Sequence, residues 1–163
     1  MIYIILILSF LLDGILFSLF SFNTPISPLF SLLSILIIYP YCDTNKKSYF
    51  ICPALLGVLY DIAYSNSLFL NTLLFIGFSY LIIKIFQSFT INIINVLIVG
   101  LIGIVLYRFS VSLFMHIIGV TSFDTVILFA SVYRSIIVNV IYIMIFYPIT
   151  TLVANKLKVK KHN

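Results

Sequence analysis

Four ionisable residues lie inside apolar stretches of the sequence, and they have the greatest capacity for chemistry. They are two acids and two bases, Asp13, Asp61, Arg108 and Arg134. Charged side chains within a membrane are costly, so they usually pair with one another or line a polar pathway. The four residues therefore predict an interior Asp/Arg cluster. Four interpretations remain open. The cluster fixes helix register and orientation, or Arg108 merely extends outward to the interface. Alternatively, the residues form a polar groove open to the outer face or to a partner's helix, or they carry protons or ions.

Other catalytic and metal-binding patterns are absent from the sequence. The chain has no glutamate, no H-E-x-x-H motif, no G-x-S-x-G elbow and no phosphate-binding glycine loop. His116 is isolated, which is more typical of an interfacial side chain than of a metal ligand. Cys42 and Cys52 are expected to be reduced and unpaired on the cytoplasmic side. We therefore expect no enzymatic activity, no cofactor and no metal site.

The composition indicates an integral membrane protein. Of the 163 residues, 63% are hydrophobic and only 8% are charged, and the mean hydropathy is +1.28. Soluble domains are typically about 45–50% apolar and about 25% charged. The net charge of +5 does not indicate nucleic-acid binding, because the basic residues form no patch with aromatic ones.

The four charged residues lie within apolar runs that are separated by short polar breaks, so the structure of these runs determines their positions. Lipid tolerates only helices or closed barrels, and the runs lack the alternation of strands, so they predict an all-α bundle of about six transmembrane helices. The bundle is predicted over residues 1–155 and a basic cytoplasmic tail over residues 156–163. The first run carries Asp13 and no basic segment, so we expect a retained helix rather than a signal peptide. The predicted helices are Ile2–Phe22, Pro28–Tyr41, Tyr49–Tyr64, Leu68–Phe86, Ile91–Phe114 and Asp124–Ala154.

The second and third runs are short, which leaves a hairpin that enters and leaves one face of the membrane as an alternative. Such a hairpin would place the ammonium groups of Lys46 and Lys47 at depth, at a cost of at least about 2.5 kcal/mol each. We therefore expect both runs to span the membrane, with bilayer thinning or tilt.

Lysine placement predicts the orientation, because short lysine-rich loops stay in the cytoplasm. With the N-terminus inside, every lysine falls on the cytoplasmic side and the outer loops contain no basic residue. Both termini are then cytoplasmic, and the tail can lie against anionic lipid. The lysines are Lys46, Lys47, Lys84, Lys156, Lys158, Lys160 and Lys161.

Small residues predict where helices approach closely. Gly100 and Gly103 lie one turn apart, and Gly57 shares a helix face with Asp61. At 1.5 Å per residue, all four charged residues lie between the membrane midplane and the outer interface. We therefore expect Asp61 to neighbour Arg108 or Arg134 in the bundle.

The segment from Pro53 to Leu81 resembles the rod shape-determining protein MreD family. That family shows a G-x-x-x-D helix end, a polar break and a helix ending in a tyrosine-leucine step, which correspond here to Gly57, Asp61, Tyr80 and Leu81. Its last helix carries an asparagine, a later proline and a basic end, to which Asn139, Pro148 and the tail are similar. Two positions depart from the pattern. Many members have Pro-Asp where this chain has Pro28-Leu29, and many have glycine where it has Phe69.

The resemblance implies a non-enzymatic plasma-membrane scaffold of the bacterial cell-elongation and peptidoglycan-synthesis machinery. Its implied partners are the single-span protein MreC, MreB filaments, the RodA transglycosylase and a penicillin-binding protein. The family also resembles, in its six-helix arrangement, the substrate-binding subunits of energy-coupling-factor vitamin transporters. That similarity supplies the alternative function, which would require a pocket of roughly 300 Å³ or more near the outer face.

Overall fold

The computed structural model describes residues 2–20, 28–42, 46–64, 69–119 and 124–159. These residues form six α-helices and one short 3₁₀ helix, and they contain no strand. Helices are therefore the only regular secondary structure in the described residues. The elements are α1 (Ile2–Phe20), α2 (Phe30–Ile38), η1 (Tyr39–Tyr41), α3 (Lys46–Tyr64), α4 (Leu70–Phe86), α5 (Ile93–Ile117) and α6 (Thr125–Lys156).

The observed helix ends differ from the predicted ones mainly in the second and third runs. α2 gives way to 3₁₀ geometry over Tyr39–Tyr41, where Pro40 lacks the backbone N–H that would continue the α-helical pattern. α3 begins earlier than predicted, at Lys46, so Lys46 and Lys47 lie in its first turn.

Two of the described helices, α5 and α6, are long and apolar enough by length and composition to cross a membrane. The other apolar helical stretches are shorter and cover Ile2–Ser18, Phe30–Tyr41, Tyr49–Tyr64 and Leu70–Phe86. The number of helices that cross the bilayer therefore stays a prediction.

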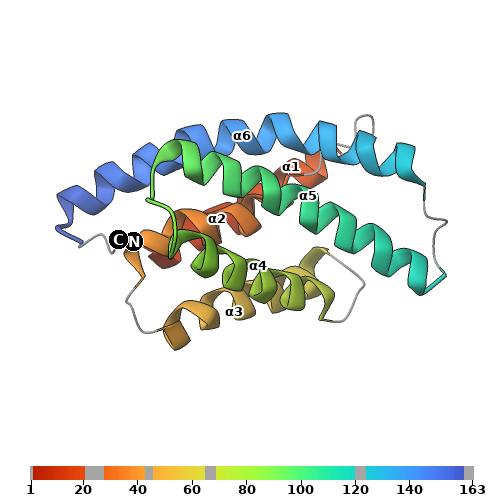
Figure 1. The fold of residues 1–163 in the computed structure, drawn as a ribbon, viewed down its shortest axis with the longest axis horizontal. Coiled ribbons are helices and arrows are strands. Elements are labelled where there is room, and N and C mark those ends of the chain that lie inside the picture. Colours follow the sequence, from red (N-terminus) through yellow and green to blue (C-terminus); the bar gives the residue numbers. More distant parts are fainter. Residues whose placement is uncertain (1, 21–27, 43–45, 65–68, 120–123, 160–163) are drawn as a thin grey trace.

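Successive helices run in opposite directions along the long axis of the molecule (Figure 1). α3 packs mainly against α4, α5 against α6, and α1 against α2. The start of α1, the turn between α4 and α5 and the end of α6 all lie at the left end in Figure 1. The opposite end is formed by the end of α5 and the start of α6, and α4 begins short of that end (Figure 1).

α2 forms the centre of the bundle. All nine of its residues are buried, and it contacts each of the other five α-helices. The stretch from Phe30 to Tyr41 is about 18 Å long at 1.5 Å per residue, shorter than a hydrocarbon core of about 30 Å. Because the surrounding helices cover α2 on every side, its length does not have to match the lipid.

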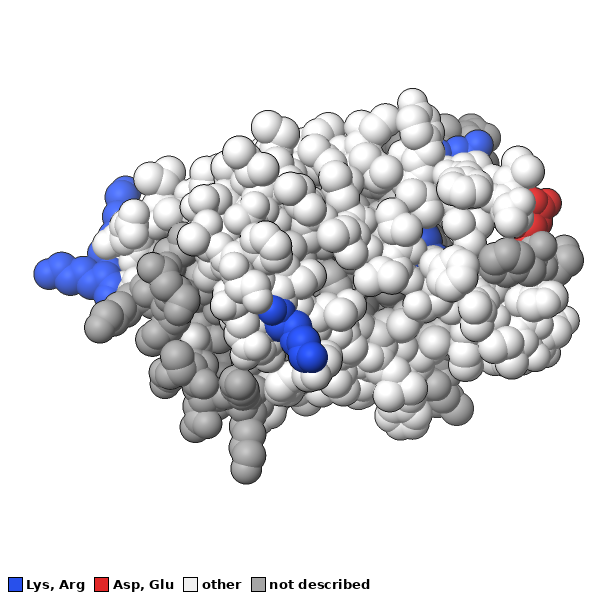
Figure 2. Space-filling model, in the orientation of Figure 1, with Lys and Arg blue, Asp and Glu red and all other residues white. Residues whose placement is uncertain are grey.

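The outer surface is dominated by uncharged side chains. Figure 2 shows few charged residues on this face, and most of them lie toward the two ends of the long axis. Large apolar side chains are exposed on the outer helices, including Ile62 of α3 at 79% and Val126 of α6 at 74%. This inversion of the usual soluble pattern is what a lipid environment requires.

Candidate functional site

Asp13 binds the N-terminal end of α2 from the neighbouring helix α1. Its Oδ1 accepts a hydrogen bond from the Phe30 N–H at 2.8 Å, and its Oδ2 accepts one from the Ser31 N–H at 2.7 Å. Oδ1 of Asn139, on α6, accepts the Leu29 N–H at 2.9 Å. The first N–H groups of a helix have no partner within that helix. Two other helices therefore satisfy the buried end of α2.

Asp61 binds the N-terminal end of α4 in the same manner. Its Oδ1 accepts the backbone and side-chain N–H groups of Asn71 at 3.1 and 2.9 Å. Its Oδ2 accepts the backbone N–H and the hydroxyl of Thr72 at 3.0 and 2.8 Å. A carboxylate at a helix N-terminus is also favoured by the helix dipole.

Gly57 permits the close approach that this contact requires. It is buried one turn before Asp61, and a Cβ added to it would lie 2.5 Å from the Thr72 Cα and 3.0 Å from the Thr72 nitrogen. Those atoms are backbone and cannot rotate away. The G-x-x-x-D pattern therefore has a physical meaning, because the glycine brings α4 near and the aspartate binds its first N–H groups.

Two consecutive residues of α5 link this helix to α4 and to α6. The Tyr107 hydroxyl donates to Asn71 Oδ1 at 2.5 Å, so it connects α5 to the Asp61 site. Arg108 Nη2 donates to Ser135 Oγ of α6 at 2.8 Å, and Arg108 lines the same cavity as Asp13.

Some of these residues line a polar cavity of about 200 Å³. It lies beside the N-terminal ends of α2 and α4, where Leu29 and Asn71 are part of its lining. Its apolar lining includes Phe17, Val111 and Met115. Its polar lining comes from four helices and consists of Asp13, Tyr60, Tyr64, Asn71, Tyr107 and Arg108.

Arg134 does not join this group, and the prediction of a four-residue interior cluster is wrong for it. Its side chain is exposed on α6, whereas Asp13 and Asp61 are buried and Arg108 is half-buried. α6 is apolar around most of its circumference, so its sequence carries no periodic signal for the face that points inward. Asp61 was also predicted to neighbour an arginine. It binds Asn71, which accepts from the Tyr107 hydroxyl, and Tyr107 directly precedes Arg108 in the sequence.

The two glycines of α5 lie at helix contacts. A Cβ at Gly100 would lie 2.5 Å from Ile143 Cδ1 of α6. A Cβ at Gly103 would overlap the ring of Phe78, which belongs to α4. Each glycine therefore faces a large side chain of a neighbouring helix.

The lysines that the structure describes lie near helix ends, with Lys84 in the last turn of α4 and Lys156 in the last turn of α6. The side chains of Lys84, Lys156 and Lys158 are exposed, and α3 begins at Lys46 and Lys47. Lys160 and Lys161 lie outside the described residues.

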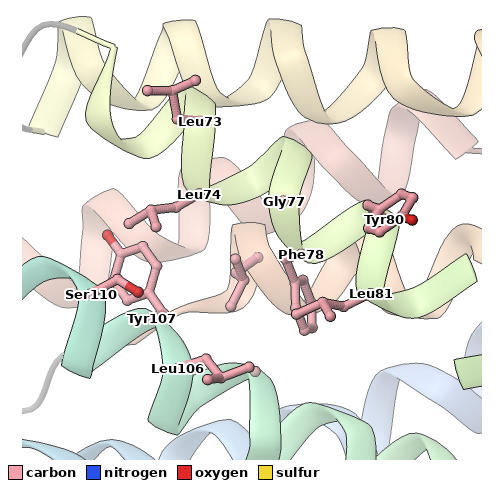
Figure 3. Close-up of a pocket in the computed structure, with 11 residues that line it drawn as sticks. Leu73, Leu74, Gly77, Phe78, Tyr80, Leu81, Leu106, Tyr107 and Ser110 are labelled. Atoms are coloured by element: carbon pink, nitrogen blue, oxygen red, sulfur yellow. The ribbon is translucent and has the colours of Figure 1, made fainter. Parts of the chain in front are cut away.

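A second and larger hollow, of about 350 Å³, opens between α4 and α5 and has Leu32 of α2 in its lining (Figure 3). Leu74 and Phe78 point from α4 toward α5, and Leu106 and Tyr107 point from α5 toward α4. We call this hollow the α4–α5 groove. Gly77 lies in its wall, and no atom lies within 4 Å of the place where its Cβ would be.

Several polar residues of the site were not predicted as site residues, notably Tyr60, Asn71 and Tyr107. Asn71 could have been found as an uncharged polar residue within an apolar run, the same signal that marked the charged residues. Tyrosine carries no such signal in this chain, because its 11 copies occur in both buried and exposed places.

The comparison with known families agrees with the resemblance in the sequence. The family model described as rod shape-determining protein MreD matches residues 1–157. The chain belongs to this family. The match includes every described helix, so both aspartate sites, the polar cavity and the α4–α5 groove lie inside the MreD region. No curated protein and no solved structure matches the chain.

Membership of the MreD family identifies the chain as a membrane protein involved in rod-shape determination. The similarity to vitamin-transporter subunits stays a prediction, as do the individual partners and the orientation in the membrane.

Proposed function

We propose that this protein is a non-enzymatic scaffold of the cell-elongation machinery in the plasma membrane. It binds an MreC-like single-span protein within the bilayer and links MreB filaments to RodA and its penicillin-binding partner. The observation that carries the proposal is the α4–α5 groove, which offers a recessed contact surface for a transmembrane helix.

The groove has the features that helix association in lipid needs. Without a hydrophobic driving force between helices, association relies on close packing at small residues and on polar contacts. Gly77 leaves room for a side chain of a partner helix, and Tyr107 and Ser110 contribute hydroxyl groups to the lining. The connections between helices are short, so little aqueous surface remains on which a partner could bind.

The proposed orientation places the lysine-bearing end in the cytoplasm, with both termini there. Helices that alternate in direction support this arrangement, because they put the start of α1 and the end of α6 at one end (Figure 1). The exposed Lys84, Lys156 and Lys158 are then available to a filament or to anionic lipid.

Filling the groove tests the scaffold function. We expect Gly77→Leu to abolish co-purification with the co-expressed MreC-like protein and to make rod-shaped cells round, while the level of the protein in the membrane stays unchanged. A Cβ added at Gly77 has no atom of another helix within 4 Å, and the unchanged membrane level would show that the loss does not come from misfolding.

Ala63→Leu is the matched control, because Ala63 is exposed on α3 outside the groove and gains similar apolar bulk. Normal partner binding in both variants would remove the groove from the proposal. Loss of partner binding in both variants would mean that added side-chain volume disturbs the complex at any position on the surface.

The alternative function is that of a transporter substrate-binding subunit, and the polar cavity is the observation that supports it. At about 200 Å³ the cavity is smaller than the roughly 300 Å³ expected of such a site, which favours the scaffold. Submicromolar binding of a vitamin by the purified protein, together with association with an ATPase module, would reverse that preference.

A further inference from the structure

The polar cavity brings an acid and a base into one space. Asp13 of α1 and Arg108 of α5 both line it. The Ser135 hydroxyl accepts from Arg108 and holds the guanidinium in place, while the backbone of α2 holds the Asp13 carboxylate. Both signs of charge are therefore fixed at the cavity wall.

This pairing selects the kind of ligand that fits. A ligand with one charge would bring a like charge beside either Asp13 or Arg108, in a partly buried place where unpaired charge is costly. A ligand with both signs can place its cation toward the carboxylate and its anion toward the guanidinium. Arginine binds phosphate well because its planar N–H groups match the phosphate oxygens.

Aromatic rings supply the rest of the recognition surface. Phe17, Tyr60, Tyr64 and Tyr107 line the cavity, and an ammonium group is attracted to the faces of such rings. The hydroxyls of Tyr64 and Tyr107 donate to Phe10 O and Asn71 Oδ1. The Tyr60 hydroxyl has no hydrogen-bond partner among the described residues, so it is available to a ligand.

We propose that this cavity binds a zwitterionic group that carries an ammonium and a phosphate, such as the head group of an aminophospholipid. A volume of about 200 Å³ suits a head group better than a drug-sized molecule, for which about 300 Å³ or more is usual. Phe17 lines the cavity yet is 56% exposed, so it lies at the rim, where an acyl chain would leave. Free phosphoethanolamine shares the same chemistry and is the other source.

Thermal denaturation in detergent tests the proposal with three added probes: phosphatidylethanolamine, phosphatidylglycerol and free phosphoethanolamine. We expect phosphatidylethanolamine to raise the midpoint in a saturable manner and phosphatidylglycerol, which lacks the ammonium, to have little effect. Arg108→Gln should weaken the apparent affinity by about tenfold or more, which corresponds to about 1.4 kcal/mol. An equal response to phosphoethanolamine would support the cavity and assign the soluble source.

Tyr60→Phe keeps the test valid if Arg108→Gln fails to fold, because it removes only a hydroxyl that has no described partner. It should weaken phosphatidylethanolamine binding roughly threefold to tenfold, in the range of one lost hydrogen bond. The matched controls are Arg134→Gln and Tyr133→Phe, whose side chains are exposed on α6 outside the cavity. Equal responses to both lipids, or equal losses in the cavity and control variants, would overturn the proposal.

Discussion

The two aspartate sites solve the same problem in different ways. Asp61 binds the helix that directly follows its own, at residues 10 and 11 positions later in the chain. Asp13 also binds the following helix, but the end of α2 is complete only when Asn139 arrives from α6, 110 positions away from Leu29. α3 and α4 thus form a locally closed hairpin, whereas α2 depends on the whole bundle.

The sites also differ in depth. Asp61 lies three residues before the end of α3 and is 8% exposed, while Asp13 lies seven residues before the end of α1 and is 2% exposed. Water can therefore reach the Asp61 site more easily when its carboxylate is removed. Depth predicts that removal of the Asp13 carboxylate destabilises the protein more. The number of hydrogen bonds predicts the opposite, because Asp61 accepts more of them than Asp13.

Replacement of each aspartate distinguishes the effect of depth from that of the number of hydrogen bonds. It should change the free energy of unfolding more than the other substitutions do. Asp13→Leu should reduce the free energy of unfolding by about 4 kcal/mol, because two buried charge-assisted hydrogen bonds are lost and their donors are stranded. Asp61→Leu should cost only about 2 kcal/mol, since water can replace part of its interactions. Thermal or denaturant unfolding in detergent measures both. A larger loss for Asp61→Leu would mean that bond number dominates over depth.

The close approach in the α3–α4 hairpin is tested by Gly57→Ala. The added Cβ would overlap the Thr72 backbone, so the helices must separate and lengthen the Asp61 hydrogen bonds, with a destabilisation of about 2 kcal/mol. Gly77→Ala is the control, because no atom lies within 4 Å of its Cβ and alanine favours helix by about 0.5–1 kcal/mol. The two unfolding midpoints should therefore shift in opposite directions. A shift in the same direction would contradict the steric explanation.

The smallest effect is expected just before α4, where Phe69 has a φ of 63°. A left-handed conformation costs a residue with a Cβ roughly 1–2 kcal/mol, and glycine avoids this cost. Because Phe69 is 60% exposed, Phe69→Gly should raise the free energy of unfolding by about 1 kcal/mol or less. Phe69→Ala keeps a Cβ and serves as the control. Equal stabilisation by alanine would assign the gain to loss of the exposed ring.

The φ value of Phe69 accounts for the glycine that the family pattern has at this position. Many MreD proteins have glycine where this chain has Phe69, and the left-handed backbone there is one that glycine adopts easily. The other departure is at Leu29, where many members have aspartate. Here Leu29 offers no side-chain cap, and Asp13 and Asn139 bind the end of α2 instead.

Helix ranges could be predicted from the sequence because an apolar run in lipid must satisfy its own backbone hydrogen bonds, which makes it a helix. The partners of the polar residues could not. The Asp13 carboxylate binds backbone N–H groups, which every residue except proline carries, so no residue type marks α2 as its partner. The predicted pairing of aspartates with arginines considered only side-chain charges and missed helix ends as binding groups.

The orientation of each helix about its own axis was equally hidden. A soluble helix shows its inner face by polarity, but α6 is apolar on the face that meets the bundle and on the face that meets lipid. Arg134 and Asn139 therefore looked alike in the sequence. In the structure Arg134 is exposed, while Asn139 is fully buried against the end of α2.

The dependence of α2 on Asn139 has a consequence for how the protein is made. A ribosome delivers the segment Phe30–Tyr41 long before α6, and until then the Leu29 N–H lacks the acceptor that it has in the finished bundle. The N-terminal end of α2 is therefore completed only after the last helix has been inserted. A chain that stops after α5 would leave the Leu29 N–H, at the end of its central helix, without this acceptor.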